Sequence, residues 1–152
     1  MICLGNICRS PMAEGILRSK LPKNFTVASA GTSNYHDNQK PDKRAIEVCS
    51  KHGIDISTTK GRQFKPSDFN DFDLIYVMDH ANYSDITYQA KNKVDKDKVR
   101  IITEEDPENS LDHISDPYYG EIEDFEKTYQ QLDRICSAIA EKVTEKSQSE
   151  QG

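Results

Sequence analysis

A cysteine and an arginine separated by five residues stand near the start of the chain, and together they could do chemistry. The segment from Cys3 to Arg9 reads CLGNICR. A thiolate is a strong nucleophile, and a guanidinium can donate two parallel hydrogen bonds to phosphate oxygens, a geometry that lysine cannot reproduce. The spacing therefore favours a site that holds a phosphate ester and attacks its phosphorus. The plainer alternative is that Cys3 is a small buried hydrophobic residue.

The surrounding residues indicate a loop between a strand and a helix. Met1–Cys3 is predicted to end a strand, and Ser10-Pro11 to begin a helix with serine as its cap. Backbone N–H groups of such a loop can converge on one anion at the helix N-terminus, where a thiol also ionises more readily. Gly5 and Asn6 tolerate the left-handed backbone that this winding requires. The predicted phosphate-binding loop consists of Leu4, Gly5, Asn6, Ile7, Cys8 and Ser10, with the Ser10 hydroxyl supporting the thiolate.

Apolar patterns along the rest of the chain alternate between strands and helices. Leu74–Met78 is a continuous apolar run, which is typical of a strand buried on both faces of a parallel sheet. An apolar stripe predicts a last helix over about 121–143. The other expected elements are strands at Thr26–Ala30 and Val99–Thr103, helices at Lys43–His52 and Ala81–Ala90, and a charged loop at Lys91–Lys98.

This alternation predicts an α/β fold, a three-layer sandwich with a central, mostly four-stranded parallel sheet and helices on both faces. Ligands of such sheets bind outside the carboxyl ends of the strands, which is where the loop after Cys3 lies. We expect one domain over residues 1–143, followed by a polar, disordered tail over residues 144–152.

Composition narrows the function classes. The net charge of −6 argues against a nucleic-acid binder, which needs a basic face. The sequence has neither an apolar run of about 20 residues nor a secretory leader, so we expect a cytoplasmic protein without membrane contact. The four cysteines lack the paired spacing of a zinc site, and the four histidines form no ligand pattern, so no metal is expected.

The run CLGNICRSPMAE closely resembles the signature of low-molecular-weight protein tyrosine phosphatases, and three further segments resemble that family in the same order. The four segments, which together extend the resemblance up to about Lys142, are Cys3–Glu14, Ser29–His36 with Pro41-Asp42, Met78-Asp79 with Asn82, and Asp116–Gly120 (DPYYG).

The resemblance implies a mechanism. Cys3 would attack the phosphoryl group to form a phosphocysteine, while Arg9 and the loop backbone stabilise the equatorial oxygens. Asp116 would protonate the leaving tyrosine oxygen and then activate the hydrolytic water. Without the family match, a turn residue before proline would be the preferred interpretation of Asp116. The implied partners are tyrosine-phosphorylated proteins or peptides and small aryl phosphates, with no metal or organic cofactor.

Further roles follow from the same resemblance. Tyr35, Tyr118 and Tyr119 would form the aromatic walls of the substrate cleft. Asn6 and Ser29 would brace the loop, and Asp79 would be either a supporting acid or only a helix cap. Cys8 would form a reversible disulfide with Cys3 under oxidation, the alternative being an ordinary loop residue. Family behaviour suggests a monomer with weak self-association.

One departure keeps alternatives open. Only Met1 and Ile2 precede Cys3, whereas family members carry several more residues there, so we expect a truncated first strand. A noncatalytic phosphate- or phosphotyrosine-binding module is therefore one alternative. Another is a phosphatase for a different phospho-residue such as phosphoarginine, although relatives with that preference carry threonine where this chain has Ile7. Arsenate reduction would require further cysteines in a mobile segment.

Overall fold

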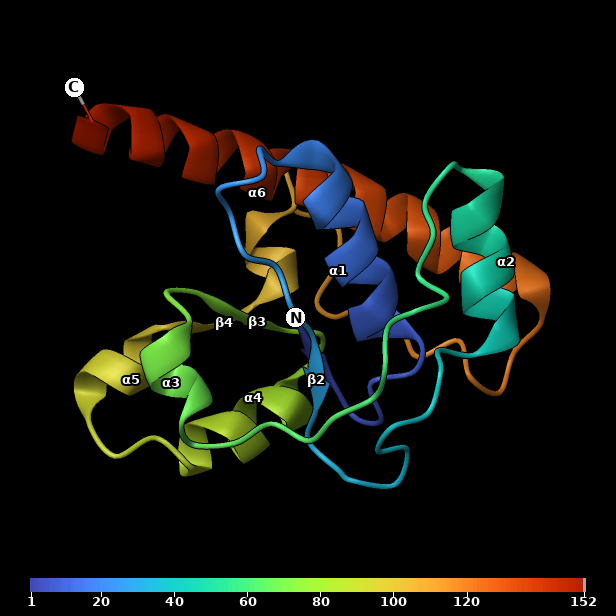
Figure 1. Cartoon of the computed structure of the whole chain (residues 1–152), viewed down its shortest axis with the longest axis horizontal. Coiled ribbons are helices and arrows are strands. Elements are labelled where there is room, and N and C mark those ends of the chain that lie inside the picture. Colours follow the sequence, from blue (N-terminus) through green and yellow to red (C-terminus); the bar gives the residue numbers. More distant parts are fainter. Residues whose placement is uncertain (152) are drawn as a thin grey trace.

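A parallel sheet of four short strands forms the centre of the molecule (Figure 1). The computed structural model describes residues 1–151, with side chains described through Gln148. The strands lie in the order β2-β1-β3-β4. They are β1 (Ile2–Cys3), β2 (Ala30–Gly31), β3 (Ile75–Val77) and β4 (Val99–Ile101). Within β1, Ile2 pairs with Ala30 on one side and with Val77 on the other, so the strand that carries Cys3 is central.

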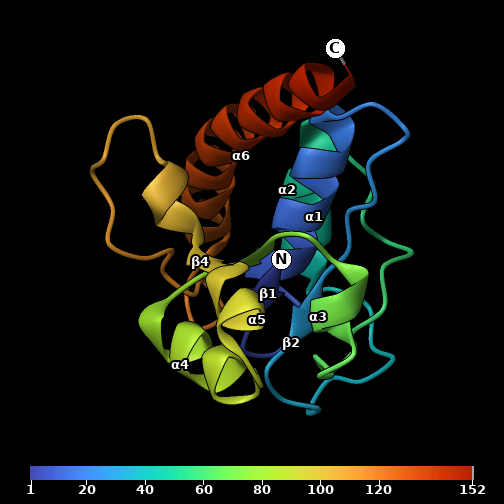
Figure 2. The same ribbon diagram turned by 90° about the vertical axis from the view of Figure 1, so that its left-hand side faces the viewer.

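Helices cover both faces of this sheet, which confirms the predicted three-layer α/β architecture (Figure 2). One face is covered by α1 (Arg9–Lys20), α2 (Lys43–Lys51) and α6 (Ile122–Gln151). The other carries α3 (Asp68–Asp71), α4 (His80–Tyr88) and α5 (Lys93–Asp97), and a 3-10 turn, η1 (Ile102–Glu105), follows β4. Within residues 1–151, no helix is both long enough and apolar enough to cross a membrane.

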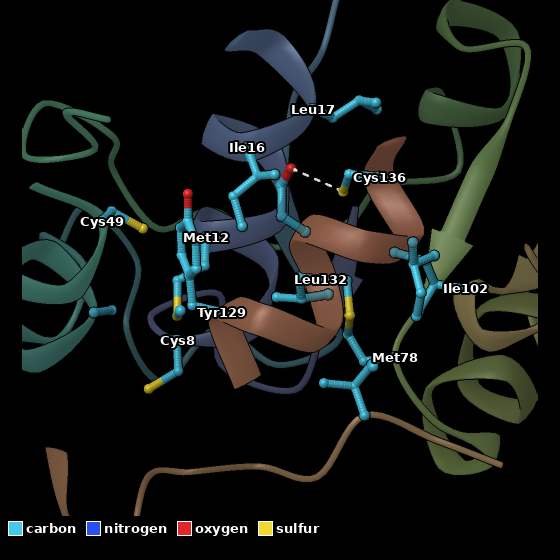
Figure 3. Close-up of a cluster of buried hydrophobic side chains, with 14 of the residues drawn as sticks. Cys8, Met12, Ile16, Leu17, Cys49, Met78, Ile102, Tyr129, Leu132 and Cys136 are labelled. Carbon is cyan, nitrogen blue, oxygen red and sulfur yellow. Dashed lines mark hydrogen bonds between the residues drawn. The ribbon is translucent and has the colours of Figure 1, made fainter. Parts of the chain in front are cut away.

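Alternating side chains of the strands fill two separate cores. Tyr76 and Met78 point into the cluster formed with α1 and α6, and part of this cluster is drawn in Figure 3. Ile75 and Val77 point into the cluster on the opposite face. Successive side chains of a strand point to opposite faces, so a strand buried on both sides must be apolar throughout. That requirement explains the continuous apolar run in the sequence.

Helix α1 is packed between the sheet and α6 and is buried almost all round. Every residue from Arg9 to Leu17 is buried. The predicted stripe of α6 packs against it, and the Cys136 thiol approaches the Ala13 carbonyl oxygen at 3.9 Å (Figure 3). A helix enclosed in this way holds its first turn firmly, and that turn carries Arg9 and Ser10.

The structure corrects three local predictions. Helix α1 begins at Arg9 with Cys8 as its N-cap, so Ser10 lies inside the helix and does not cap it. The predicted charged loop contains α5, whose first turn is capped by the Asn92 side chain. Helix α6 does not end near Val143 but continues through the supposedly disordered tail to Gln151, because glutamate, lysine and glutamine are good helix formers. The last residue of the predicted tail, Gly152, lies outside the described residues.

The Cys3 loop does not lie at the amino end of the sheet. β1 has two residues, and the Met1 amino group donates to the Ala28 carbonyl oxygen at 3.0 Å. Beside it lies a cavity of about 590 Å³, lined among others by Met1, Phe25, Phe64 and Ile75. The chemistry-bearing residues lie at the opposite, carboxyl end of the strands, where α/β sheets bind ligands.

Candidate active site

Cys3 ends β1, and the chain then turns tightly before α1. Asn6 takes the left-handed conformation, with φ 56°, and its N–H donates to the Cys3 sulfur at 3.3 Å. This confirms the backbone prediction for Asn6. Gly5 does not share it, since its φ is not positive. A Cβ at Gly5 would lie 2.9 Å from Cδ2 of the His36 side chain, so a larger residue there would require the imidazole to move.

Ser10 links the thiol to the rest of the loop. Its Oγ lies 3.0 Å from the Cys3 sulfur and 2.7 Å from the Asn6 Oδ1. All three residues are buried, and Asn6 Nδ2 has no hydrogen-bond partner among the described residues. The hydroxyl carries one proton and faces two acceptors, so its orientation depends on whether Cys3 holds a proton.

Within the described part of the chain, the Arg9 guanidinium has hydrogen-bond partners at Nη1 but none at Nε. Its Nη1 donates to Asp79 Oδ2 at 2.8 Å and to the Ile114 carbonyl oxygen at 2.9 Å. Its Nε is buried without a hydrogen-bond partner among the described residues. Leaving a buried donor unsatisfied costs about 1–3 kcal/mol or more for a charged group. The guanidinium is therefore arranged to receive an anion through its Nε edge.

Asp79 serves both functions that the sequence left open. Its Oδ1 accepts from the Asn82 N–H at 2.8 Å and caps α4, while its Oδ2 holds Arg9. Burial alone would raise the pKa of Asp79, but the hydrogen bonds from Asn82 and Arg9 keep it below its usual value. The carboxylate therefore stays charged and orients the arginine.

Asp116 lies beside Arg9, although the two are 107 positions apart in sequence. Its Oδ2 is 3.7 Å from Arg9 Nη2, and its Oδ1 accepts from the Tyr118 N–H at 3.1 Å. The side chain remains 40% exposed, so its carboxyl group is open to solvent. The fold thus brings Cys3, Arg9 and Asp116 to one end of the sheet.

The predicted tyrosines lie on two loops that flank the Cys3 loop. Tyr118 and Tyr119 meet edge to face, with ring centroids 4.9 Å apart, directly after Asp116. Tyr35 is largely exposed on the opposite loop, which is joined to the Cys3 loop because the Ser33 N–H donates to the Leu4 carbonyl oxygen at 3.0 Å.

Ser29 does not brace the Cys3 loop directly, which corrects the expectation. Its hydroxyl donates to Glu14 Oε1 at 2.7 Å, and Glu14 also pairs with Arg18 at 2.8 Å. Glu14 is buried on α1, and a buried carboxyl group is unfavourable unless hydrogen-bond donors satisfy it. Ser29 therefore acts on α1, and the loop is braced by Asn6 and Ser10.

The cysteines other than Cys3 are set up as neutral thiols. Burial raises the pKa of Cys8 well above its ordinary value, and raises those of Cys49 and Cys136 to about 12. All four cysteines are free. In the part of the chain that the structure describes, no three histidine, cysteine, aspartate or glutamate residues are grouped so that they could hold a metal ion.

Sequence reasoning missed Arg44 and gave no role to Asp42 of the Pro41-Asp42 pair, although these two residues join the Cys3 loop to the loop after Asp116. Arg44 donates to the carbonyl oxygens of Tyr118 and Gly120, each at 2.8 Å, and the Asp42 N–H donates to the Ile7 carbonyl oxygen at 2.7 Å. The signal was the arginine two positions after Pro41-Asp42. Its spacing alone could not show that it reaches a loop over 70 residues away.

Comparisons with known proteins agree with this geometry. The family model described as low molecular weight phosphotyrosine protein phosphatase matches residues 1–149. The human protein of that name is 41% identical over 148 residues, covering 93% of this chain and 92% of its own. A protein tyrosine phosphatase from Entamoeba histolytica superposes with a TM-score of 0.90 at 30% identity, covering 96% of both chains. Wzb from Vibrio vulnificus, solved with benzylphosphonate, gives 0.83 at 33% identity, covering 93% of this chain and 94% of its own.

The chain belongs to the low molecular weight phosphotyrosine protein phosphatase family. It is accordingly a hydrolase of phosphoric monoesters.

Proposed function

We propose that this protein hydrolyses phosphotyrosine and small aryl phosphates through a phosphocysteine formed on Cys3. The observation that carries the proposal is the buried Arg9 guanidinium, whose Nη1 is held by Asp79 while its Nε has no partner. It lies at the start of α1, beside the nucleophile and Asp116. A tetrahedral phosphate dianion satisfies that donor together with the N–H groups of the loop.

In the first step, the Cys3 thiolate attacks phosphorus and the bond from phosphorus to the aryl oxygen breaks. Asp116 gives its proton to the departing phenolate oxygen. In the second step, Asp116 takes a proton from water, the water oxygen attacks phosphorus, and the phosphorus–sulfur bond breaks. Inorganic phosphate leaves and the thiolate is restored, so atoms and charges balance over the cycle.

Ser10 and Asn6 serve the thiolate form of Cys3. When Cys3 loses its proton, the Ser10 hydroxyl turns its hydrogen to the sulfur 3.0 Å away. Asn6 then presents its amide NH₂ group to the Ser10 oxygen in place of Oδ1, which uses the donor that otherwise lacks a partner. Two side chains thus support the charged nucleophile without a metal or an external base.

The substrate is assigned from the rim of the site. Aromatic side chains on both flanking loops favour a ring over a short serine side chain. The benzylphosphonate held by the Vibrio vulnificus relative supports the same class, since it carries a phenyl ring one carbon from phosphorus. Ile7, where phosphoarginine-directed relatives carry threonine, also favours phosphotyrosine.

Cys8 provides a protective partner for the nucleophile. Its buried thiol stays protonated, so under oxidation it is Cys3 that becomes the sulfenic acid and Cys8 that displaces water to close a disulfide. We propose that this reversible disulfide shields Cys3 from further oxidation. A Cys8→Ser variant should be inactivated irreversibly by hydrogen peroxide, whereas the parent should recover after treatment with dithiothreitol.

Turnover of 4-nitrophenyl phosphate by the chain and by Cys3→Ser tests the proposal. Activity that is lost in Cys3→Ser, together with a phosphoenzyme trapped by rapid acid quench, would support it. Peptides carrying phosphotyrosine, phosphoserine or phosphoarginine then separate the substrate classes. Binding of phosphate without turnover, in a chain that remains folded, would favour the noncatalytic binding module instead.

A further inference from the structure

Arg44 holds the backbone of the loop that carries Asp116. Its Nη1 donates to the Gly120 carbonyl oxygen and its Nη2 to the Tyr118 carbonyl oxygen, both at 2.8 Å. Arg44 belongs to α2, whereas these two acceptors follow Asp116 by two and four residues. The Arg44 side chain therefore joins α2 to the loop that follows Asp116.

The guanidinium of Arg44 is itself firmly placed. Asp42 accepts from its Nε at 3.0 Å and from its Nη2 at 2.9 Å, and the ring of Phe125 lies 4.4 Å from its central carbon. The hydrogen bonds from Arg44 hold the pKa of Asp42 below its usual value. With a charged partner on one edge and an aromatic ring against its face, the guanidinium presents its remaining donors in a fixed direction.

Asp42 extends the connection to the phosphate-binding loop. Its N–H donates to the Ile7 carbonyl oxygen at 2.7 Å, and its side chain also accepts from the Arg44 N–H at 2.9 Å. A continuous set of hydrogen bonds thus runs from the Cys3 loop through Asp42 and Arg44 to the loop after Asp116. It ties the nucleophile's loop to the acid's loop through α2.

After Asp116, Pro117 is buried, and among the described residues the side-chain hydrogen bonds that reach the backbone of residues 117–120 from another element come from Arg44. The segment before Asp116 is anchored at Ile114, whose N–H donates to the Met78 carbonyl oxygen and whose own carbonyl oxygen accepts from Arg9. After it, Tyr119 is 94% exposed, and the turn is closed internally by the Gly120 N–H on the Pro117 carbonyl oxygen. Arg9 and Arg44 thus hold the two sides of Asp116.

We propose that Arg44 is a positioning residue that sets where the Asp116 carboxyl group stands relative to the leaving oxygen. The inference rests on the proposed role of Asp116 as general acid. Arg44 touches neither substrate nor nucleophile, so its removal should leave phosphate binding intact and weaken proton transfer. A displacement of about 1 Å in a catalytic group can lower a rate about a hundredfold.

The test compares two leaving groups. Phenolate needs a proton from the acid as it departs, whereas 4-nitrophenolate is a weaker base and depends on it less. We expect Arg44→Met, which retains the packing on Phe125, to lower kcat/KM for phenyl phosphate by roughly ten- to a hundredfold. Its kcat/KM for 4-nitrophenyl phosphate should fall several times less. Arg44→Lys, which can still donate to a carbonyl oxygen, should recover part of the loss.

Arg134→Met is the matched control. Arg134 makes the same two-pronged pair with Asp106, at 2.9 and 3.0 Å, and its side chain is 28% exposed against 32% for Arg44. It also pairs with Glu108 and lies against Ser110, six positions before Asp116 in the sequence, and none of the described residues 114–120 accepts a hydrogen bond from it. Losing it should cost comparable stability while leaving the ratio of the two substrates unchanged. Inhibition by inorganic phosphate should be equal in the parent and all three variants.

The outcomes separate this inference from the function on which it rests. If Asp116→Ala shows the large leaving-group dependence and Arg44→Met does not, the positioning role is overturned and the phosphatase mechanism stands. An equal loss on both substrates in Arg44→Met, together with weaker phosphate inhibition, would also overturn it as a merely structural effect. If Asp116→Ala itself shows no leaving-group dependence, both assignments fail.

Discussion

The Cys3 loop and the Asp116 loop do complementary work but are built differently. Cys3, Asn6 and Arg9 are each no more than 3% exposed, and their loop is enclosed by strands and by a buried helix. The Asp116 side chain is 40% exposed, and the loop around it is held chiefly by arginine side chains. The proposed phosphate-binding loop is thus preformed by its backbone, whereas placement of the proposed acid depends on a few side chains.

Chemistry explains the difference. Binding a small anion requires several N–H groups fixed on one point, which only a rigid, buried turn provides. An acid that meets leaving groups on large substrates must stay near solvent. Substitutions in the buried loop should therefore abolish activity, and those around the exposed loop should reduce it by degrees.

The largest effect is expected from Arg9→Lys. Lysine keeps the charge but cannot both hold Asp79 and present a second pair of donors to phosphate. We expect kcat/KM for 4-nitrophenyl phosphate to fall about 10²–10³-fold, the cost of losing a transition-state donor. Inhibition by inorganic phosphate should weaken as well. A loss below tenfold in a folded variant would contradict the view that the buried loop tolerates no substitution.

Gly31 packs against the Cys3 loop and Gly120 lies in the loop after Asp116, so alanine substitutions at these positions compare the rigidity of the two loops. A Cβ on Gly31 would lie 2.8 Å from the Leu4 carbonyl oxygen and 3.1 Å from the Gly5 carbonyl carbon, which are backbone atoms of the Cys3 loop. Gly31→Ala should lower the free energy of unfolding by about 1–3 kcal/mol. It should also lower kcat/KM roughly tenfold or more by displacing the loop.

Gly120→Ala is the comparison on the exposed side. There a Cβ meets only side-chain atoms of Asp124, whose carboxyl group can turn away, whereas its Cβ at 3.0 Å must shift slightly with the helix. We expect its unfolding free energy, measured by urea titration, to stay within about 1 kcal/mol of the parent. Equal costs for the two alanine variants would remove the distinction between a rigid and an adjustable loop.

Ser10→Ala should lower activity less than Arg9→Lys. It removes the hydroxyl 3.0 Å from the Cys3 sulfur, and a hydrogen bond to a charged group is worth about 1.5–3 kcal/mol. We expect kcat/KM to fall roughly ten- to a hundredfold, and iodoacetamide at neutral pH to alkylate Cys3 more slowly. The matched control is Ser19→Ala, since Ser19 donates only to the Ile16 carbonyl oxygen within the same helix. Unchanged alkylation in Ser10→Ala would refute the role given to the hydroxyl.

The smallest effect concerns acid stability at the Arg44 anchor. The pKa of Asp42 is lowered by Arg44, so the folded state binds fewer protons than the unfolded state. Its contribution to stability is therefore present above the unfolded pKa of about 4 and lost as pH falls through the lower folded pKa.

Urea unfolding of the parent and of Asp42→Asn at pH 7 and pH 3 measures this contribution. The difference in unfolding free energy should be about 1 kcal/mol or less at pH 7, because the pair is partly exposed, and should shrink at pH 3. A difference that does not change with pH would mean that the charge of Asp42 contributes nothing to the anchor.

Much of the fold could be read from periodicity. The apolar run around Ile75–Val77 predicted a doubly buried strand, and the stripe along α6 predicted its packing face. Helix ends were less predictable, because the propensity of polar residues in the tail carried α6 further than its apolar stripe. Ser10 was expected both to cap its helix and to support Cys3. It lies inside the helix and does not cap it, but its hydroxyl lies 3.0 Å from the Cys3 sulfur, as predicted, and donates to Asn6.

The sequence by itself indicated the chemistry that we propose, because the proposed nucleophile, the arginine and the turn that joins them lie within seven consecutive residues from Cys3 to Arg9. Only the tertiary structure decided what surrounds them: Ile114 and Asp79 on Arg9, Glu14 as the partner of Ser29, and Arg44 on the loop after Asp116. Local spacing fixes a tight turn because few backbone conformations satisfy it. Contacts across some 70 to 105 positions depend on how strands and helices pack, and no pattern within one segment encodes them.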